Sequence, residues 1–522
     1  MEKSPRQHQI EALEAIEKIN EGIIQLPTGS GKTYIQSLAI INNLNKAKRW
    51  SKKQNEIPVF VVLGPRIMLC DQLYNEVKTE LVQQNIDIQY LIVNSGNLQD
   101  KKDEEWKDLS PTYIYRELTS TTSSVQIREE YEKTKREDVP LIIFSTYDSA
   151  ERIMDANLPV YMVLADEAHY LVSEEFSWIA EENKSPEIKQ FQAYRKYYFT
   201  ATLKDTASDK GLGMNNEELF GPIIYQKSPA ELIKAGEILR PRIHLVHVNS
   251  DENDDEINAD ATAIVDGFTE HRIHNNIGTK LLVITKGSEH LNDIVNHPKI
   301  QRLLRLRPAL QIFDISSEYK PRINGKEVKR KEFLEELQSL DDLKEAIIFH
   351  INILTEGIDV PGITGIMPLT NLKLSRFLQT LGRATRLYLN DRIKIYNKEL
   401  EPSDTEEFIK AYAWILIPFY NEIGEDIKNS IFEMTTYLRT FGFNPREDIV
   451  IKQLRGRAIP DSLENINEKD TRAKALFDIA LEVEHSIETE ETANKLNEEV
   501  YTIIEELKNK PIEELFKFYE SL

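Results

Sequence analysis

The sequence has very little cysteine: Cys70 is the only one in 522 residues. A single cysteine excludes a framework of intrachain disulfides and is typical of a reducing compartment. Paired sets of Cys and His ligands are also missing, so we expect no structural zinc. The stretch Met1 to Arg6 has no apolar signal core, and no apolar run approaches the roughly 20 residues of a membrane helix. We therefore expect a cytoplasmic protein with no membrane partner.

Basic residues are scarce relative to acidic ones. The chain has 65 Lys and Arg against 87 Asp and Glu, a net charge of -22. Nucleic-acid-binding proteins usually show a basic surface, so strong nonspecific binding at physiological salt is not expected. Part of the excess is local, because residues 461–522 hold 17 acidic and 7 basic residues. The acidic excess in the rest of the chain is compatible with a protein that binds a phosphate backbone through main-chain amides, hydroxyls and a few cations.

Short apolar runs alternate with amphipathic stretches over the first two thirds of the chain. This pattern is typical of parallel strands joined by crossover helices, and it predicts two α/β domains. The first set of strands is expected at residues 23–26, 59–63, 90–93, 141–145, 161–165 and 197–200. The second set is expected at residues 243–248, 281–285, 310–315, 346–350, 365–369 and 414–418.

These patterns divide the chain into three parts. We expect a first domain at 1–240 with a charged insertion at about 97–137, a second domain at 241–456, and an acidic helical extension at 457–522. No internal repeat of solenoid period is found, and no acid-acid-lysine set indicates a built-in nuclease.

A glycine loop follows the first expected strand and precedes a helix expected from Tyr34 to Ile41. This strand-turn-helix context is the one that a phosphate cradle requires, although Leu26 stands where the full pattern has a glycine. The glycines let the main chain approach a polyphosphate, Lys32 can reach its outer phosphates, and the Thr33 hydroxyl can bind Mg²⁺. The candidate nucleotide-binding residues are Pro27, Thr28, Gly29, Ser30, Gly31, Lys32 and Thr33.

Two adjacent acids follow the apolar run Tyr161 to Ala165. They are expected at the carboxyl end of a strand, the edge at which open α/β sheets bind ligands. Asp166 would hold Mg²⁺, and Glu167 would orient or deprotonate the attacking water. His169 could couple the nucleotide state to a neighbouring segment.

Far downstream, Arg383 and Arg386 follow Gln379 and Gly382. If this stretch is helical, the two arginines share one face. Guanidinium groups aimed across a cleft stabilise a transferring phosphoryl group, which is worth on the order of 10³ to 10⁵ in rate. The three elements together predict a split ATPase site.

In this arrangement the sequence resembles the superfamily 2 helicases and translocases over about residues 1–420. Its motif style is similar to restriction-subunit and phage or repair DNA helicases, through Thr200-Ala201-Thr202, the Gln379 start of the last motif, and the stretch 215–240. Further blocks occur in the order of the family. They are Arg6 and Gln9, Gly64-Pro65-Arg66, Asp71-Gln72-Leu73, Ser95-Gly96, Ser145-Thr146-Tyr147, Asp166 to His169, Ile284 to Gly287, Leu354 to Pro361, and Gln379 to Arg386.

The resemblance implies two tandem RecA-like parallel-sheet domains with ATP and Mg²⁺ between them. It implies that Arg6 and Gln9 read adenine, that Gly357 and Asp359 approach the nucleotide, and that Thr200 and Thr202 link hydrolysis to domain movement. It also implies nucleic-acid contacts at Arg66, Ser95, Gly96, Thr146, Tyr147, Thr285, Lys286 and Thr355.

The favoured function is an ATP-dependent DNA helicase or duplex translocase acting on single-stranded, duplex or forked DNA. Restriction or phage defence, phage replication and repair are all open as pathways. RNA is a less favoured substrate. A third hypothesis is a nucleotide-dependent clamp or switch, recruited by a protein partner through the acidic tail.

Overall fold

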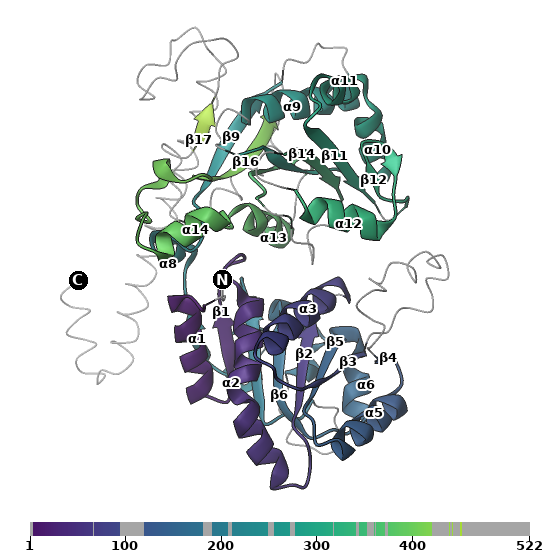
Figure 1. Cartoon of the computed structure of the whole chain (residues 1–522), viewed down its shortest axis with the longest axis vertical. Helices are drawn as coiled ribbons and strands as arrows, with labels where there is room; N and C mark the ends of the chain where they lie inside the picture. Colours follow the sequence, from purple (N-terminus) through teal and green to yellow (C-terminus); the bar gives the residue numbers. More distant parts are fainter. Residues whose placement is uncertain are drawn as a thin grey trace, which may run out of the picture.

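The protein is seen in a computed structural model of the whole chain, and two α/β lobes contain the described helices and strands (Figure 1). The first lobe is purple to blue and the second teal to green. The described residues are 4–65, 67–93, 119–180, 191–206, 211–248, 255–271, 277–316, 318–340, 344–351, 360, 362–370, 374–419, 438, 441 and 449–451.

The sheet of the first lobe has eight strands in the described residues, and every neighbouring pair is parallel. In spatial order they are β4 (Thr119–Thr121), β3 (Gln89–Val93), β5 (Leu141–Thr146), β2 (Val59–Gly64), β6 (Val160–Asp166), β7 (Arg195–Thr200), β1 (Glu21–Gln25) and β8 (Ile223–Gln226). The helices of this lobe are α1 (Gln7–Lys18), α2 (Lys32–Lys52), α3 (Ile67–Gln83), α5 (Ser124–Arg136), α6 (Ala150–Asp155) and α7 (Glu217–Phe220). The next helix, α8 (Pro229–Lys234), packs through Leu232 into the core of the second lobe.

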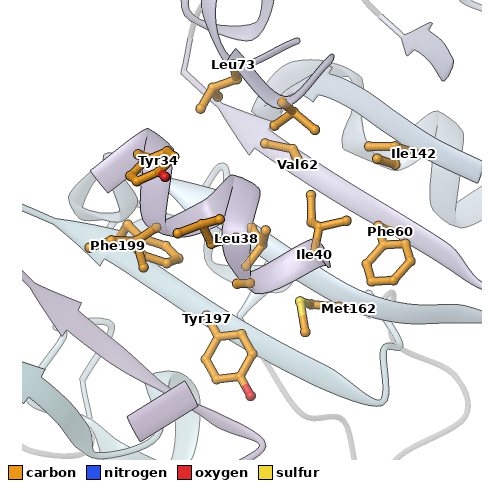
Figure 2. Packing of buried hydrophobic residues seen from close by; sticks show 14 of the residues in the cluster. Tyr34, Leu38, Ile40, Phe60, Val62, Leu73, Ile142, Met162, Tyr197 and Phe199 are labelled. Atoms are coloured by element: carbon orange, nitrogen blue, oxygen red, sulfur yellow. The ribbon is translucent and has the colours of Figure 1, made fainter. Parts of the chain in front are cut away.

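Successive residues of these strands enter two different apolar layers, as the two-residue period of a strand requires. Phe60 and Val62 of β2 pack with α1, α2 and α3 on one face, and Figure 2 shows part of this layer around Leu38 and Ile40 of α2. Val59 and Val61 face the opposite layer. Because both faces are covered, each strand is a nearly continuous apolar run.

The sheet of the second lobe has nine strands in the described residues. In spatial order they are β13 (Lys326–Glu327), β12 (Arg322–Ile323), β11 (Leu310–Ile315), β14 (Glu345–His350), β10 (Lys280–Ile284), β15 (Gly365–Pro368), β16 (Ala413–Phe419), β9 (Pro241–His247) and β17 (Ile449–Ile451). Only the pairs that include β12 are antiparallel. The helices of this lobe are α9 (Glu256–His271), α10 (Ser288–Asn296), α11 (Pro298–Leu306), α12 (Arg330–Gln338), α13 (Leu374–Ala384) and α14 (Leu389–Tyr396).

Every strand expected from the sequence is present, with small differences at the ends. The expected insertion at 97–137 is wrong in its second half. There β4 extends the sheet and α5 packs on it through Ile127 and Tyr131, which are fully buried. Only a few residues of α5 are buried, and charged residues surround them. The apolar spacing typical of a helix could therefore not be recognised in the sequence. The expected helical extension at 457–522 lies outside the described residues.

None of the helices in the described parts of the chain is long and apolar enough to cross a lipid bilayer.

Candidate nucleotide site between the lobes

The glycine loop connects the carboxyl end of β1 to the start of α2. Gly29 and Gly31 have φ angles of 88° and 85°, in the left-handed region that residues with a Cβ rarely adopt. Lys32 is 8% exposed, and its Nζ donates a hydrogen bond to the Leu26 carbonyl at 3.2 Å. The loop therefore has the curved backbone and the adjacent cation that a phosphate cradle requires.

Asp166 is the last residue of β6 and is 4% exposed. Its Oδ1 accepts a hydrogen bond from Gln36 Nε2 at 3.0 Å, and its carbonyl accepts one from the Tyr147 hydroxyl at 2.5 Å. Burial and the neighbouring Glu167 charge raise the pKa of Asp166 to about 7, against the opposing effect of Lys32. This carboxyl is thus held in a dry position beside the cradle.

Glu167 has φ 51° and ψ 48°, so a residue with a Cβ occupies the left-handed region directly after the strand. Its Oε2 lies 3.5 Å from His169 Nδ1. The same histidine nitrogen lies 3.3 Å from Thr200 Oγ1, which donates to the Thr202 carbonyl at 2.7 Å. Burial lowers the pKa of His169. The structure therefore brings the residues expected for catalysis and coupling into one contact chain.

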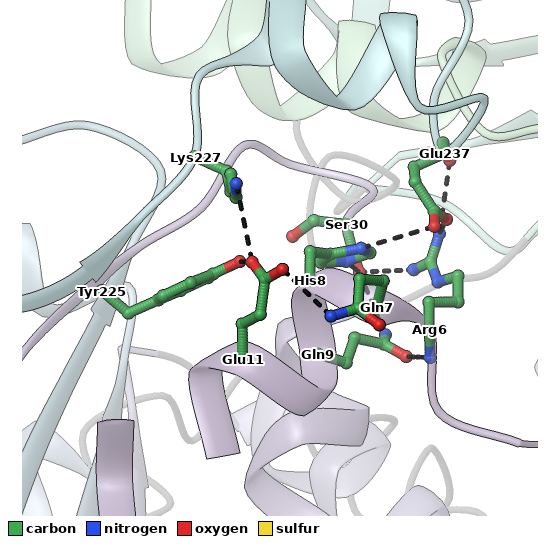
Figure 3. Close-up of polar contacts among 9 residues, drawn as sticks. All are labelled: Arg6, Gln7, His8, Gln9, Glu11, Ser30, Tyr225, Lys227 and Glu237. Carbon is green, nitrogen blue, oxygen red and sulfur yellow. Dashed lines mark hydrogen bonds and ion pairs between the residues drawn. The ribbon is translucent and has the colours of Figure 1, made fainter. Parts of the chain in front are cut away.

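Three side chains at the start of α1 converge on one carbonyl of the glycine loop (Figure 3). Ser30 O accepts hydrogen bonds from the Arg6 guanidinium and from Gln9 Nε2 at 3.1 Å, and His8 Nε2 lies 2.9 Å from it. Gln9 Oε1 accepts from the Arg6 backbone N–H at 2.9 Å. In this arrangement Arg6 and Gln9 contact the loop itself, and the sequence had not singled out His8.

Glu237 connects this cluster to the segment between the lobes. Its Oε2 lies 2.9 Å from Arg6 Nη1, and its Oε1 lies 3.7 Å from His8 Nδ1. Burial works to raise the pKa of Glu237, but the neighbouring His8 and the charge of Arg6 lower it overall. The chain just before β9 is therefore tied to the glycine loop by a charged contact that the sequence did not predict.

Helix α13 of the second lobe touches the glycine loop of the first. A Cβ added to Gly382 would lie 2.2 Å from Thr28 Cγ2, and one added to Gly29 would lie 3.0 Å from the Gly382 carbonyl and 3.7 Å from Arg386 Cγ. The two backbones approach this closely because both positions are glycine. The phosphate cradle and the arginine segment are therefore direct neighbours.

The condition under which Arg383 and Arg386 would share one helical face, that the whole stretch is helical, is not met. Helix α13 ends at Ala384, and Arg386 forms an isolated antiparallel bridge with Ile238. The Leu239 N–H donates to the Thr385 carbonyl at 2.7 Å. Arg383 is 8% exposed. The inter-lobe connection pairs with the chain here and draws Arg386 out of the helix.

Lys410 is a buried lysine that the sequence did not reveal. It is 1% exposed, and its Nζ donates to the carbonyls of Ala384 at 2.6 Å and Arg386 at 3.0 Å. The Asp391 carboxylate accepts the backbone N–H groups of Ile409 and Lys410. Lys410 thus fixes the end of α13 from the side opposite the inter-lobe connection, and no local motif marks it.

Several expected nucleic-acid contacts are buried side chains, which argues against direct contact with a strand. Thr146 contacts Ser149, Tyr147 contacts the Asp166 carbonyl, and Thr285 contacts the His350 carbonyl at 3.4 Å. These residues support the loops around the site instead. Lys286 is exposed and forms ion pairs with Glu256 and with Asp260 at 3.2 Å.

The remaining expected site residues lie outside the described residues. They are Arg66, Ser95, Gly96, Thr355, Gly357, Asp359 and the side chain of Gln379. Within the described part of the chain, no group of three or more His, Cys, Asp or Glu residues could hold a metal ion.

Comparison with known proteins agrees with this architecture. Residues 2–205 match the family model described as Type III restriction enzyme, res subunit. The DNA-bound ATP-dependent Type ISP restriction-modification enzyme LlaBIII superposes on 92% of this chain with a TM-score of 0.61 and 16% sequence identity. This likeness shows a shared fold of two tandem α/β lobes.

A second structure with this fold is a nuclease-deletion mutant of the Type ISP restriction-modification enzyme LlaGI in complex with a DNA substrate mimic. It superposes on 98% of this chain with a TM-score of 0.56 and 15% identity. The chain covers 33% and 35% of these two enzymes, about a third of their length. No curated protein matches the sequence.

Proposed function

We propose that the chain is an ATP-driven DNA translocase or helicase. The observation that carries the proposal is the direct contact between the glycine loop of one lobe and the arginine segment of the other, at Gly29 and Gly382. A nucleotide bound at the loop would touch both lobes, so its binding and loss would change how they are held together. The family match over residues 2–205 supports the assignment.

The residues present fit a nucleotide with its magnesium ion. The left-handed glycines leave the loop backbone free for phosphate, and Lys32 adds a cation at the start of α2. Thr33 and Asp166 would hold Mg²⁺, which supplies charge neutralisation to the phosphates when it is bound. One hydroxyl and one carboxylate suit Mg²⁺, because this ion usually keeps waters and substrate phosphates as its other ligands.

The side chains around the loop have distinct roles in hydrolysis. Glu167 orients or deprotonates the attacking water, and Lys32, Arg383 and Arg386 stabilise the negative charge that develops on the phosphoryl group. His169, Thr200 and Thr202 form the contact chain that connects Glu167 to the segment after β7. A change at the water-binding carboxylate therefore reaches that segment through three successive contacts.

Movement on a strand follows from the shared site. ATP stabilises the arrangement in which both lobes contact it, and hydrolysis removes part of that shared contact. The lobes then separate with an altered grip on the nucleic acid. The ion pair between Arg6 and Glu237 places the connection between the lobes within reach of the same loop.

DNA is the preferred substrate. The motif style favours it, and the solved structures of LlaBIII and LlaGI both contain DNA or a DNA mimic. A restriction or phage-defence role, phage replication and repair are the pathways that fit, in the cytoplasm. The ATPase rate measured with single-stranded, duplex and forked DNA and with RNA, at two salt concentrations, tests the proposal. Rates indifferent to every DNA form would refute it, and selective stimulation by RNA would favour the RNA helicase.

The acidic extension favours a second candidate, a nucleotide-dependent switch recruited by a protein partner. Residues 461–522 carry a net charge of about -10 in the sequence, which suits a basic partner. Deleting the residues after Arg457 separates the two functions. A docking tail leaves DNA-stimulated hydrolysis intact and abolishes complex formation, whereas loss of stimulation places the tail in the motor itself.

A further inference from the structure

One short stretch of this acidic chain is strongly basic. From Tyr319 to Lys331 the sequence has six basic residues and one acidic residue, in a chain with a net charge of -22. The stretch follows β11 and contains the hairpin β12–β13 and the first residues of α12. We call residues 319–331 the basic hairpin. None of the helicase motifs identified in the sequence includes it.

The basic hairpin is a well-defined element. Its turn residues Asn324 and Gly325 have φ angles of 52° and 77°, which the tight turn of a two-residue hairpin requires. The Asn324 side chain accepts a hydrogen bond from the Ile312 N–H at 2.7 Å, and the Asn324 N–H donates to the Ile312 carbonyl at 2.7 Å. The hairpin is therefore fastened to the edge of the sheet at its turn.

Arg322 anchors the other end of the hairpin. Its Nε donates to Asp314 Oδ2 at 2.6 Å, its Nη1 donates to Asn292 at 2.9 Å, and its guanidinium lies 4.4 Å from the centre of the Tyr319 ring. The Val328 N–H also donates to the Pro321 carbonyl at 2.9 Å. One of the six cations thus holds the hairpin in place, so that its exposed neighbours have fixed positions.

The register places two of the lysines at the carboxyl edge of the sheet. Because Arg322 pairs with Asp314 near the end of β11, Lys320 lies beyond the last residue of that strand. Lys329 follows Val328, which is bonded to Pro321, and so lies beside Lys320. The carboxyl ends of β10 and β14 meet at this same edge, next to the exposed Lys286. Figure 1 shows β12 at the margin of the upper lobe.

The exposed lysines of the hairpin are not neutralised within the described structure. Lys320, Lys326 and Lys329 are exposed, and none of them forms a salt bridge with a described acidic residue. By contrast, the exposed Lys286 nearby is paired with two carboxylates. An acidic protein that leaves three neighbouring cations unpaired has a surface suited to an anionic partner.

We infer that the basic hairpin is a contact for the DNA phosphate backbone, through Lys320, Lys326 and Lys329. The inference rests on the proposed function and deepens it by naming a contact that the motifs do not contain. Lysines act as point charges on phosphates, so this contact fixes the position of the strand on the second lobe without reading its sequence. Its location on an edge hairpin means that it moves with the second lobe when the cleft opens.

The test is the salt dependence of DNA binding by the full chain. A triple variant, Lys320→Gln, Lys326→Gln and Lys329→Gln, is compared with a matched variant, Lys48→Gln, Lys52→Gln and Lys53→Gln. The control lysines are exposed at the far end of α2, roughly 30 Å along the helix from the glycine loop. Binding of a fluorescent duplex is measured from low to physiological salt, and melting temperatures verify that both variants are folded.

The hairpin variant is expected to bind more weakly and to lose about 2 to 3 units from the slope of log K against log salt, close to 0.9 per phosphate contact. The control variant should keep the slope of the unmodified chain. Equal slopes in the two variants would overturn the inference. A slope loss seen only with an RNA duplex would overturn DNA as the partner. An unmodified chain that binds no DNA and shows no DNA-stimulated hydrolysis would refute the proposed function instead.

Discussion

Glu167 is a residue of the candidate site whose backbone is left-handed, with φ 51° and ψ 48°, although it has a Cβ. Left-handed backbone is strained for a residue with a Cβ, and such strain is frequent where a side chain is aimed for function. We predict that Glu167→Gln binds ATP with little loss of affinity but hydrolyses it about 10² to 10⁴ times more slowly, because the amide cannot take a proton from water. Nucleotide binding and single-turnover hydrolysis measure the two effects. Turnover retained at the original rate would remove the water-orienting role.

Lys32→Ala is the informative contrast to that variant. Lys32 lies at the start of α2 next to the loop, so its loss removes a cation from the ground state as well as from the transition state. We expect ATP affinity and hydrolysis to fall together. An unchanged dissociation constant for ATP would show that the loop binds phosphate without this ammonium.

Lys410 allows a prediction of pH dependence. Burial, together with the charges of Arg386 and Lys280, lowers the pKa of Lys410 to about 7, whereas an unfolded lysine has a pKa of about 10.4. Between these values the unfolded chain binds a proton that the folded chain lacks, so this residue makes stability rise as the pH increases from about 7 to about 10. In Lys410→Met the melting temperature should therefore rise less with pH over this window.

The exposed lysine of α14, Lys394, provides the control for that experiment. Lys394→Met removes a charge from the neighbouring surface and should keep the pH dependence of the unmodified chain. The same pH dependence in Lys410→Met would contradict the assignment. Because Lys410 also holds the carbonyls of Ala384 and Arg386, its loss should lower the hydrolysis rate more than it changes ATP affinity.

At the scale of elements, the packing of α13 on the glycine loop gives a steric prediction. A Cβ at Gly382 would lie 2.3 Å from Thr28 Cβ, a distance that neither backbone can accept without moving apart. Gly382→Ala should therefore slow hydrolysis about 10²-fold, because displacement of about 1 Å at a catalytic site has an effect of that size. Hydrolysis at the original rate, with the melting temperature also unchanged, would show that this contact is not needed for activity.

Helices and strands were predictable where burial leaves a recognisable pattern of apolar residues in the sequence. Strands such as β2 and β6 are buried on both faces, so their apolar runs predicted them directly. The edge elements were missed, because β12 and β13 have two residues each and the cations of the hairpin obscure them. The same applies to α5, in which only a narrow stripe is buried.

The site was predictable only in its local parts. The glycine loop and the acids after β6 are contiguous in sequence, and their chemistry is visible in the residue types. Contacts such as Glu237 with Arg6 and Lys410 with Ala384 join residues far apart in the chain, and no pattern in a single sequence reveals them. The end of α13 before Arg386 could not be predicted for the same reason, because Arg386 forms a bridge with the distant Ile238.

At the scale of the whole molecule, three contacts among the described residues near the glycine loop link the first lobe, the connection between the lobes and the second lobe. These are Gly29 with Gly382, Arg6 with Glu237, and Ile238 with Arg386. All three involve either the loop, the arginine segment or the connection between the lobes. A ligand at the loop is therefore positioned to change the relation of the lobes, which is the physical requirement for a motor.

The most direct test of this account is single-turnover ATP hydrolysis by Arg386→Ala, with the dissociation constant for ATP measured on the same variant. If the second lobe completes the site, hydrolysis falls on the order of 10³-fold or more while ATP still binds. Hydrolysis at the rate of the unmodified chain would contradict the account, because it would show that the Arg386 guanidinium of the second lobe is not needed to complete the site.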